Sequence, residues 1–259
     1  MVVDLHNHTP LCNHAEGEMQ EYIEAAIKAG TRYFGFADHA PMDFDPKYRM
    51  AFSQMSSYEQ KVLQAKETYK DKITILLGYE VDYLPGHMDK RVLEADVDYL
   101  IGSVHFLEGW GFDNPEFIGG WQEQNIDEIW QKYFDTIEEM AKSQLFDIVG
   151  HLDLIKVFKF MPTKEIIPMA KNALQAIKDA NMVLELNVAG YRKEVAEAYP
   201  SKELLQEAFQ LDIPITFASD AHKPEQVNLY EEKIIQLAHN VGYTECTYFL
   251  KRKPYTLKF

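Results

Sequence analysis

Short apolar runs alternate with longer amphipathic stretches along most of the chain. The short runs are typical of buried strands, and apolar residues at 3.6-residue spacing in the longer stretches indicate helices. Strands alternating with helices predict a parallel sheet with right-handed crossovers, which is an α/β fold. The predicted strands are Val2–His8, Tyr33–Ala37, Ile73–Val81, Tyr99–Val104, Phe146–His151, Val183–Val188 and Ile213–Ser219. The predicted helices are Met19–Ala29, Ser57–Tyr69, Asp89–Ala95, Ile126–Lys142, Lys164–Ala180, Lys202–Gln210 and Pro224–Val241.

The stretch Ile126–Lys142 carries the strongest helical pattern. Asn125, followed by Glu128 three residues later, is typical of a helix N-cap. We interpret the apolar stripe of this helix as core packing rather than as a cofactor site. Two segments lack clear periodicity and are predicted to be irregular loops, Asp43–Gln54 and Glu108–Glu123.

Length and cysteine content favour one reduced domain. The chain has 259 residues. Since α/β barrels of roughly 250 residues form one domain, we expect a single domain over residues 1–259. Two cysteines, Cys12 and Cys246, do not make a disulfide framework, which favours a cytoplasmic protein. No signal peptide is visible, and no apolar run approaches the roughly 20 residues that span a bilayer, so no membrane partner is expected.

The formal net charge of −15 bears on the choice of partner. Binding to a phosphate backbone relies on clustered Lys and Arg side chains, so this charge argues against nucleic acid. The oligomeric state stays open at this point.

Histidines and carboxylates lie where the predicted strands end. Histidine is the commonest transition-metal ligand near neutral pH. Side chains two apart on a strand share a face, so His6 and His8 are able to hold one ion together. The residues in these strand-end positions are His6, His8, His14, His39, Glu80, His105, His151, Asp220 and His222.

Any one of these residues taken alone is more often structural than a ligand. The carboxyl ends of barrel strands converge on one mouth, however, which favours a shared metal site. These seven histidines and two carboxylates exceed the four ligands of a tetrahedral zinc ion, so more than one ion is expected.

The order of these motifs resembles the PHP (polymerase and histidinol phosphatase) superfamily from His6 to His222. This resemblance implies a distorted (β/α)7 TIM-like barrel that holds three divalent transition-metal ions, with zinc, manganese and iron open as identities. The motifs are His6-Asn7-His8, Asp38-His39, Glu80, Ser103-Val104-His105, Gly150-His151 and Ser219-Asp220-Ala221-His222.

The resemblance also implies a ligand set for each ion. Glu80 would bridge two ions, and a water shared by those ions would become hydroxide near neutral pH and attack phosphorus. Asp220, His222 or a water on the third ion would protonate the leaving group. The implied sets are His6, His8, Glu80 and Asp220 for one ion, Glu80, His105 and His151 for a second, and His14, His39 and His222 for a third.

Other residues near these motifs are interpreted more plainly. Asp38, Asp82 and Asp153 are expected to orient ligating imidazoles rather than bind an ion directly. Cys12 is interpreted as an ordinary buried thiol rather than as a ligand.

Longer stretches resemble the monofunctional histidinol-phosphate phosphatase branch of the superfamily. They include Asp38-His39-Ala40-Pro41-Met42, Glu80-Val81-Asp82-Tyr83 and Asn187-Val188-Ala189-Gly190-Tyr191-Arg192. This resemblance implies hydrolysis of a small-molecule phosphate ester, L-histidinol phosphate, in histidine synthesis. It also implies two basic residues that hold the phosphate, here Lys156 and Arg192.

Two other functions compete with this interpretation. A PHP-type hydrolase of another phosphomonoester, a phosphodiester or a nucleotide is the first. A basic groove would favour the phosphodiester or nucleotide substrate, and none is visible in the sequence. A metal-binding module without turnover is the second, and missing ligands would favour it, yet none of the nine positions is substituted.

Side chains for the ammonium and imidazole of histidinol phosphate are expected in two loops that otherwise cap the barrel. They are Asp43, Phe44, Asp45, Trp110, Phe112 and Asp113.

Overall fold

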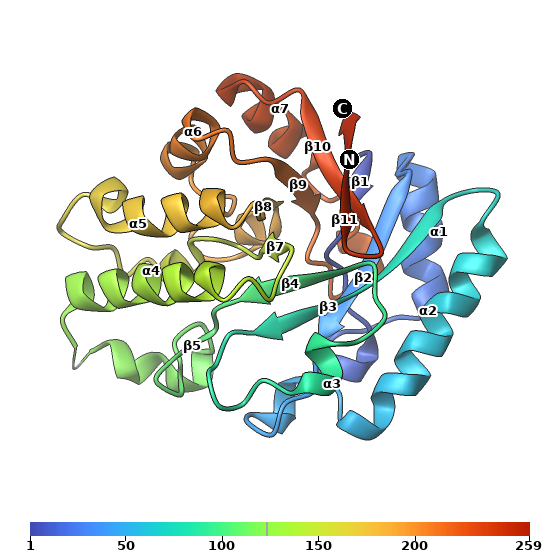
Figure 1. Ribbon diagram of the computed structural model, residues 1–259, viewed down its shortest axis with the longest axis horizontal. Helices are drawn as coiled ribbons and strands as arrows, with labels where there is room; N and C mark the ends of the chain where they lie inside the picture. Colours follow the sequence, from blue (N-terminus) through green and yellow to red (C-terminus); the bar gives the residue numbers. More distant parts are fainter. Residues whose placement is uncertain (123) are drawn as a thin grey trace.

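Seven parallel strands form the central sheet of the protein, with helices packed around it (Figure 1). The computed structural model describes residues 1–122 and 124–259. The sheet order is β1-β2-β3-β4-β7-β8-β9. These strands are β1 (Val3–Asp4), β2 (Tyr33–His39), β3 (Thr74–Asp82), β4 (Tyr99–Ser103), β7 (Ile148–Val149), β8 (Val183–Asn187) and β9 (Ile215–Ala218).

The first and last strands of this sheet lie next to each other, so the sheet curls into a nearly closed barrel. The Leu5 amide donates to the Phe217 carbonyl at 3.0 Å, and the His8 amide donates to the Ala221 carbonyl at 2.9 Å. A parallel bridge between Asn7 and Ala221 continues this seam. The expected distorted (β/α)7 barrel is therefore confirmed.

Helices cover the outside of the barrel, and three of them have the predicted bounds. These three are α1, α4 and α6, and the Asn125 side chain caps α4 by accepting from the Asp127 amide, as predicted. No helix in residues 1–122 and 124–259 has the length and apolar character needed to cross a membrane. The helices are α1 (Met19–Ala29), α2 (Met55–Tyr69), α3 (Lys90–Leu93), α4 (Ile126–Lys142), α5 (Ile166–Asp179), α6 (Lys202–Gln210) and α7 (Glu231–Val241).

Two predicted element boundaries are wrong for a backbone reason. Helix α7 begins at Glu231 rather than Pro224, because Tyr230 has a positive φ of 70°. Strand β7 ends at Val149 rather than His151, whose φ is 23°. Positive φ values break both helical and extended runs, and side-chain periodicity does not reveal them.

Two small hairpins were not predicted. The predicted loop Glu108–Glu123 is only partly irregular. It contains β6 (Trp110–Gly111), which pairs with β5 (Phe106–Leu107), and a 3₁₀ helix follows over Pro115–Trp121. The end of that loop, Glu123, lies outside the described residues. The second hairpin joins β10 (Glu245–Leu250) to β11 (Lys253–Lys258), and its charged, largely exposed β11 lacks the apolar run that marks the other strands.

The interior of the barrel is filled by side chains beneath its carboxyl-terminal mouth. The Tyr99 ring crosses the interior, and its hydroxyl donates to the Leu5 carbonyl at 2.5 Å. Gly35 and Gly78 leave room for this ring, since a Cβ on Gly35 would lie 2.0 Å from the Tyr99 hydroxyl oxygen. Because side chains fill this part of the barrel, the cavity lies at the opposite end, where the strands finish.

Candidate metal centre

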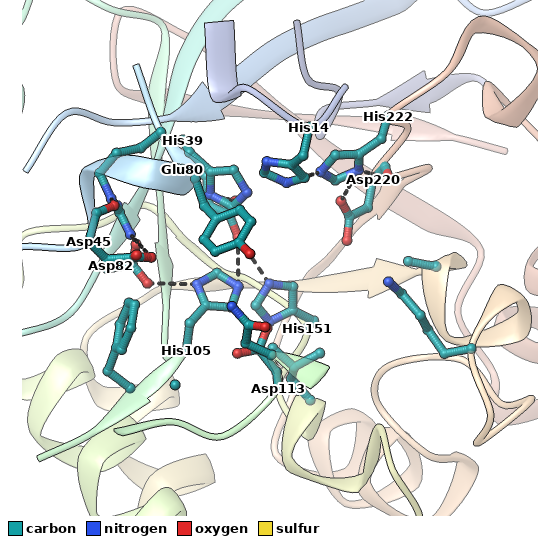
Figure 2. A pocket seen from close by; sticks show the side chains of 18 of the residues that line it. His14, His39, Asp45, Glu80, Asp82, His105, Asp113, His151, Asp220 and His222 are labelled. Carbon is teal, nitrogen blue, oxygen red and sulfur yellow. Dashed lines mark hydrogen bonds and ion pairs between the residues drawn. The ribbon is translucent and has the colours of Figure 1, made fainter. Parts of the chain in front are cut away.

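Residues from six strands or the segments just after them meet at the carboxyl-terminal mouth (Figure 2). His39 and Glu80 lie within β2 and β3, whereas the other ligand candidates lie in the segments that leave the strands. His6 and His8 follow β1, which ends at Asp4, so the predicted strand Val2–His8 is too long. Parallel strands still bring all of these side chains to one place.

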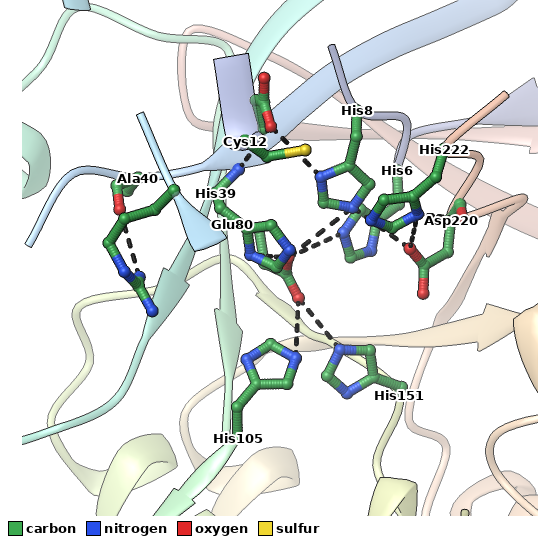
Figure 3. Close-up of polar contacts among 12 residues, drawn as sticks. His6, His8, Cys12, His39, Ala40, Glu80, His105, His151, Asp220 and His222 are labelled. Atoms are coloured by element: carbon green, nitrogen blue, oxygen red, sulfur yellow. Dashed lines mark hydrogen bonds and ion pairs between the residues drawn. The ribbon is translucent and has the colours of Figure 1, made fainter. Parts of the chain in front are cut away.

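Glu80 lies at the centre of the cluster and is 1% exposed. Figure 3 shows imidazoles converging on its carboxylate from several directions. Its Oε2 lies 2.8 Å from His39 Nδ1 and 3.3 Å from His6 Nε2. Its Oε1 lies 3.0 Å from His151 Nε2 and 3.6 Å from His105 Nε2. Burial alone would raise the pKa of Glu80, but the surrounding imidazoles hold that pKa well below its ordinary value.

The donor atoms fall into small groups that are compact enough to hold an ion. One group contains His6, His8 and Glu80, and Asp220 lies beside it, with its Oδ1 3.2 Å from His8 Nε2. A fourth combination includes the buried thiol of Cys12. The groups are His6, His8 and Glu80; Glu80, His105 and His151; His14, His39 and His222; and His8, Cys12 and His222.

Two parts of the cluster differ in burial. We call His6, His8, Glu80, His105 and His151 the inner group, and His14, His39 and His222 the outer group. Glu80, His6, His8 and His151 are buried, whereas the His14 side chain is exposed and His222 is partly exposed. The outer group therefore forms the rim of the site and the inner group its floor.

Buried carboxylates hold three histidines of the inner group from behind. His6 Nδ1 lies 2.6 Å from Glu185, His8 Nδ1 lies 3.3 Å from Asp38, and His105 Nδ1 lies 2.6 Å from Asp82. In each ring this contact leaves Nε2 facing the centre of the cluster. A carboxylate on the far ring nitrogen fixes the tautomer and increases the basicity of the nitrogen that binds a metal.

The outer group is held differently. His14 Nδ1 lies 2.8 Å from the Cys12 carbonyl, and His222 Nδ1 lies 3.2 Å from the Asp220 carbonyl. The two Nε2 atoms of these rings lie 3.0 Å apart. Burial lowers the pKa of His39 to about 4 and that of His222 well below its ordinary value. Both rings are therefore neutral near pH 7 and keep a lone pair for a metal ion.

The chemistry of these donors fits divalent transition-metal ions. Within the described part of the chain, His6 Nε2 and Glu80 Oε2 are buried and make no hydrogen bond of good geometry, although imidazole nitrogens lie close to Oε2. Buried polar atoms without partners carry a large energetic penalty, which a bound cation removes. Imidazole nitrogens with carboxylate oxygens suit zinc, manganese or iron better than they suit calcium or magnesium.

A cavity of about 480 Å³ opens above this cluster. Asp113 lies on one wall, near His105 and His151 (Figure 2). Of the loop residues expected to meet a substrate, Asp45 and Asp113 line the cavity. Asp43, Phe44, Trp110 and Phe112 are not among its lining residues; Asp43 pairs with His87 at 2.8 Å, and Phe112 is fully buried.

Comparison with known proteins decides the family. The PHP domain family matches residues 4–189 of the chain. The chain belongs to the PHP domain family. A Deinococcus radiodurans protein named "Probable histidinol-phosphatase" is 38% identical over 92% of this chain and 93% of its own length. The Bacillus subtilis "Histidinol-phosphatase" is 29% identical over 90% of this chain and 98% of its own.

A solved structure carries the same fold as this PHP protein. It is the crystal structure of histidinol phosphate phosphatase from Lactococcus lactis, complexed with zinc, L-histidinol and phosphate. It superposes with a TM-score of 0.79 over 98% of both chains at 20% sequence identity. At this identity the likeness supports the fold, which agrees with the family assignment.

The two basic residues expected to hold phosphate lie in different surroundings in this PHP domain. Arg192 lines the cavity, and its Nη2 donates to the carbonyls of Ser219 at 2.9 Å and Asp220 at 2.8 Å. Lys156 is 1% exposed and is not among the lining residues. Its ammonium pairs with Asp153 at 2.9 Å and Glu197 at 2.6 Å. Two carboxylates thus already offset the Lys156 charge.

Two residues of this PHP site were missed by sequence reasoning. Glu185 lies in β8 and contacts both His6 and the His151 amide. An acidic residue inside a buried apolar strand was the available signal, because a buried carboxylate requires a partner. Arg49 is also buried; it donates to Asp82 at 2.8 Å and lines the cavity. It lies between predicted elements, so no periodicity pointed to it.

Proposed function

We propose that this protein hydrolyses the phosphomonoester L-histidinol phosphate to L-histidinol and phosphate with the help of divalent transition-metal ions. The observation that carries the proposal is the gathering of seven imidazoles around Glu80 and Asp220, at the floor and rim of a cavity of about 480 Å³. Relatives named histidinol-phosphatase match about nine-tenths of the chain, which supports the substrate. The substrate is a small molecule, and nucleic acid is not a partner.

Three ions, with zinc, manganese and iron as candidates, fit the available donors. We assign His6, His8, Glu80 and Asp220 to one ion, Glu80, His105 and His151 to a second, and His14, His39 and His222 to a third. When bound, the ions supply an activated water and neutralise charge on the phosphoryl group. Glu80 keeps its carboxylate between the first two sets, with one oxygen facing each.

The local charge of the site favours an anionic substrate despite the net charge of −15. Three divalent ions carry six positive charges, against one negative charge each from Glu80 and Asp220. Exposed charges elsewhere are screened over about 8–10 Å. A phosphate dianion is therefore attracted by the site, while the acidic surface repels polyanions.

Three further residues complete the proposed active site: Arg192, and Asp220 and His222 just after β9. Arg192 lies in the cavity wall with its guanidinium held by two carbonyls, so it is oriented before substrate arrives. Asp220 and His222 line the same cavity, and the pKa of each is held well below its ordinary value, so neither carries a proton to donate near pH 7. A water on the ion that His222 helps to hold would therefore protonate the leaving alkoxide, with Asp220 and His222 positioning that water. Asp45 and Asp113 offer carboxylates to the substrate ammonium.

We also infer that residues 1–259 form one PHP-type barrel domain. The segments after the first and the last strand of the barrel both contribute to the site, since His8 contacts Asp220. Cys12 and Cys246 are free and buried, which agrees with the expected reduced protein. Placement in the cytoplasm stays a prediction.

A panel of phosphate esters tests the substrate assignment. Phosphate release is measured for L-histidinol phosphate, aryl phosphates, other phosphomonoesters, phosphodiesters and nucleotides, with zinc, manganese or iron added. We expect the highest kcat/KM for L-histidinol phosphate. Equal efficiency on unrelated monoesters, or a preference for diesters, would replace this substrate with the alternative PHP-type hydrolase.

A further inference from the structure

One wall of the cavity holds two buried hydrogen-bond donors that the metal cluster does not use. Tyr199 is 0% exposed, and its hydroxyl has no hydrogen-bond partner among the described residues. Nη1 of Arg192 is also buried and has no hydrogen-bond partner among these residues, whereas Nη2 donates to two carbonyls. Both side chains line the cavity above the metal cluster. Burying a donor without a partner costs about 1–3 kcal/mol, so two such donors in one wall indicate a ligand with acceptor atoms.

The two donors belong to segments that pack directly against each other. Arg192 ends the 3₁₀ turn Ala189–Arg192, which follows β8. Gly190 of this turn lies against the Tyr199 ring, and a Cβ on Gly190 would be 3.0 Å from that ring and 2.0 Å from the Glu197 carbonyl. Only a glycine allows this close approach, so the turn and Tyr199 form one packed unit.

Several contacts fix Tyr199 in this place. Its amide donates to the Asn187 carbonyl at 3.0 Å, and its own carbonyl accepts from the Asn187 amide at 2.7 Å. Lys156 donates to the preceding Ala198 carbonyl at 2.8 Å. The following Ser201 amide donates to Asp153 at 2.9 Å. Lys156 and Asp153 thus hold the backbone on both sides of Tyr199, which gives Lys156 a positioning role.

The hydroxyl of Tyr199 stays protonated at neutral pH. An ordinary phenol has a pKa of about 10, so this hydroxyl keeps its proton. A protonated phenol is a donor, and the guanidinium of Arg192 has donors only. The two groups together therefore match an anion with several acceptor oxygens, which is the character of a phosphoryl group.

We propose that the Tyr199 hydroxyl and Nη1 of Arg192 form a phosphate clamp that binds the phosphoryl oxygens facing away from the metal ions. Tyr199 is then a phosphate-binding residue, and Lys156 acts through the Tyr199 segment instead of touching phosphate. The clamp rests on the proposed phosphatase function but not on the identity of the alcohol that is released.

The test uses the metal-loaded Tyr199→Phe variant, which keeps the buried ring and removes only the hydroxyl. The probe is inorganic phosphate, with its affinity measured by calorimetry and by inhibition of aryl phosphate hydrolysis. We expect the affinity to fall roughly 10- to 100-fold, the scale of one hydrogen bond to a charged group. Metal content should stay at the wild-type value. Tyr191→Phe is the matched control, since Tyr191 lies in the same turn but does not line the cavity, and its phosphate affinity should not change.

The outcomes separate this clamp from the substrate assignment. Wild-type phosphate affinity in Tyr199→Phe, even with slower turnover, would overturn the clamp. Weakened phosphate binding in a protein that prefers another monoester would support the clamp and reject histidinol phosphate. The double variant Tyr199→Phe/Arg192→Ala should lose less than the product of the two single losses, because both groups contact the same phosphoryl group.

Discussion

The inner and outer groups of the metal centre use the same side chain in two different settings. The inner histidines His6, His8 and His151 are buried, and His6, His8 and His105 each have a carboxylate behind the ring. Of the outer histidines, His14 and His222 rest on main-chain carbonyls instead. Carboxylates make imidazole a stronger metal ligand, whereas a neutral carbonyl adds less. Ligand type alone therefore does not set metal affinity, and we expect the outer ion to bind more weakly and exchange faster.

The pKa directions of His105 and His39 agree with this difference. Although burial opposes it, the carboxylates of Asp82 and Glu80 raise the pKa of His105 to about 10. In the outer group burial lowers the pKa of His39 to about 4. The contrast is not uniform, because contacts with Cys12 raise the pKa of His14 in the outer group although burial opposes it.

Removing the shared carboxylate should have the largest effect. Glu80→Gln takes a charge from the middle of the inner group, which should release inner ions and lower kcat/KM by about a thousandfold or more. The measurements are phosphate release and elemental analysis of the purified variant. A folded Glu80→Gln protein with near wild-type turnover would show that the inner group is not the centre of the chemistry.

Removing one supporting carboxylate should have a smaller effect. Glu185→Gln keeps the shape of the side chain but loses the charge behind His6, so inner metal affinity should fall roughly 10- to 100-fold. Competition with a chelator measures that affinity. Glu245→Gln is the matched control, because Glu245 is exposed at the start of β10 and belongs neither to the donor groups nor to the cavity lining. Equal metal affinities in both variants would show that the carboxylate behind His6 does not strengthen metal binding by the inner group.

Partial chelation should separate the two groups directly. We expect one ion to leave at a chelator concentration about tenfold or more below that needed for the remaining ions. In the His14→Asn variant, whose changed side chain is exposed at the rim, this first step should disappear while the later steps stay. Loss of all ions in one step, in both proteins, would mean that the groups bind as a single unit.

The smallest effect is expected at Cys12. Its thiol lies with His8 and His222 in one of the compact donor groups, yet each of the three proposed ions is assigned at least three other donors. Cys12→Ser should leave metal content and turnover within about twofold of wild type and lower the free energy of unfolding by about 1 kcal/mol. A lost ion in Cys12→Ser would instead add sulfur to the outer site.

The sequence allowed the barrel and its ligand candidates to be predicted, because both depend on repeated patterns. Apolar runs marked the seven barrel strands, and a histidine or carboxylate followed most of them. Strand ends were predicted less well, since the positive φ values of His151 and Asp220 depend on tertiary contacts. These values turn the chain at the point where the ligand side chains leave the strands, which no periodicity describes.

The second layer of the site was predicted only in part. Asp38 and Asp82 were found because each adjoins a motif, whereas Glu185 supports His6 from a strand 179 residues away. Lys156 matched a motif but is enclosed by carboxylates that sequence spacing could not place there. Local motifs therefore indicated which residues carry chemistry, and three-dimensional packing determined which of them line the cavity.

The seam between β1 and β9 delays completion of the site until nearly the whole barrel has been synthesised. Asp220 reaches His8 across 212 residues, and His222 reaches His14 across 208. A nascent chain that ends before β9 carries His6, His8 and Glu80 but lacks both late ligands. Long-range contacts of this kind form slowly, because the intervening chain must be ordered first. Metal ions that bind during translation therefore meet an incomplete set of donors, and activity begins only when the last barrel strand has docked.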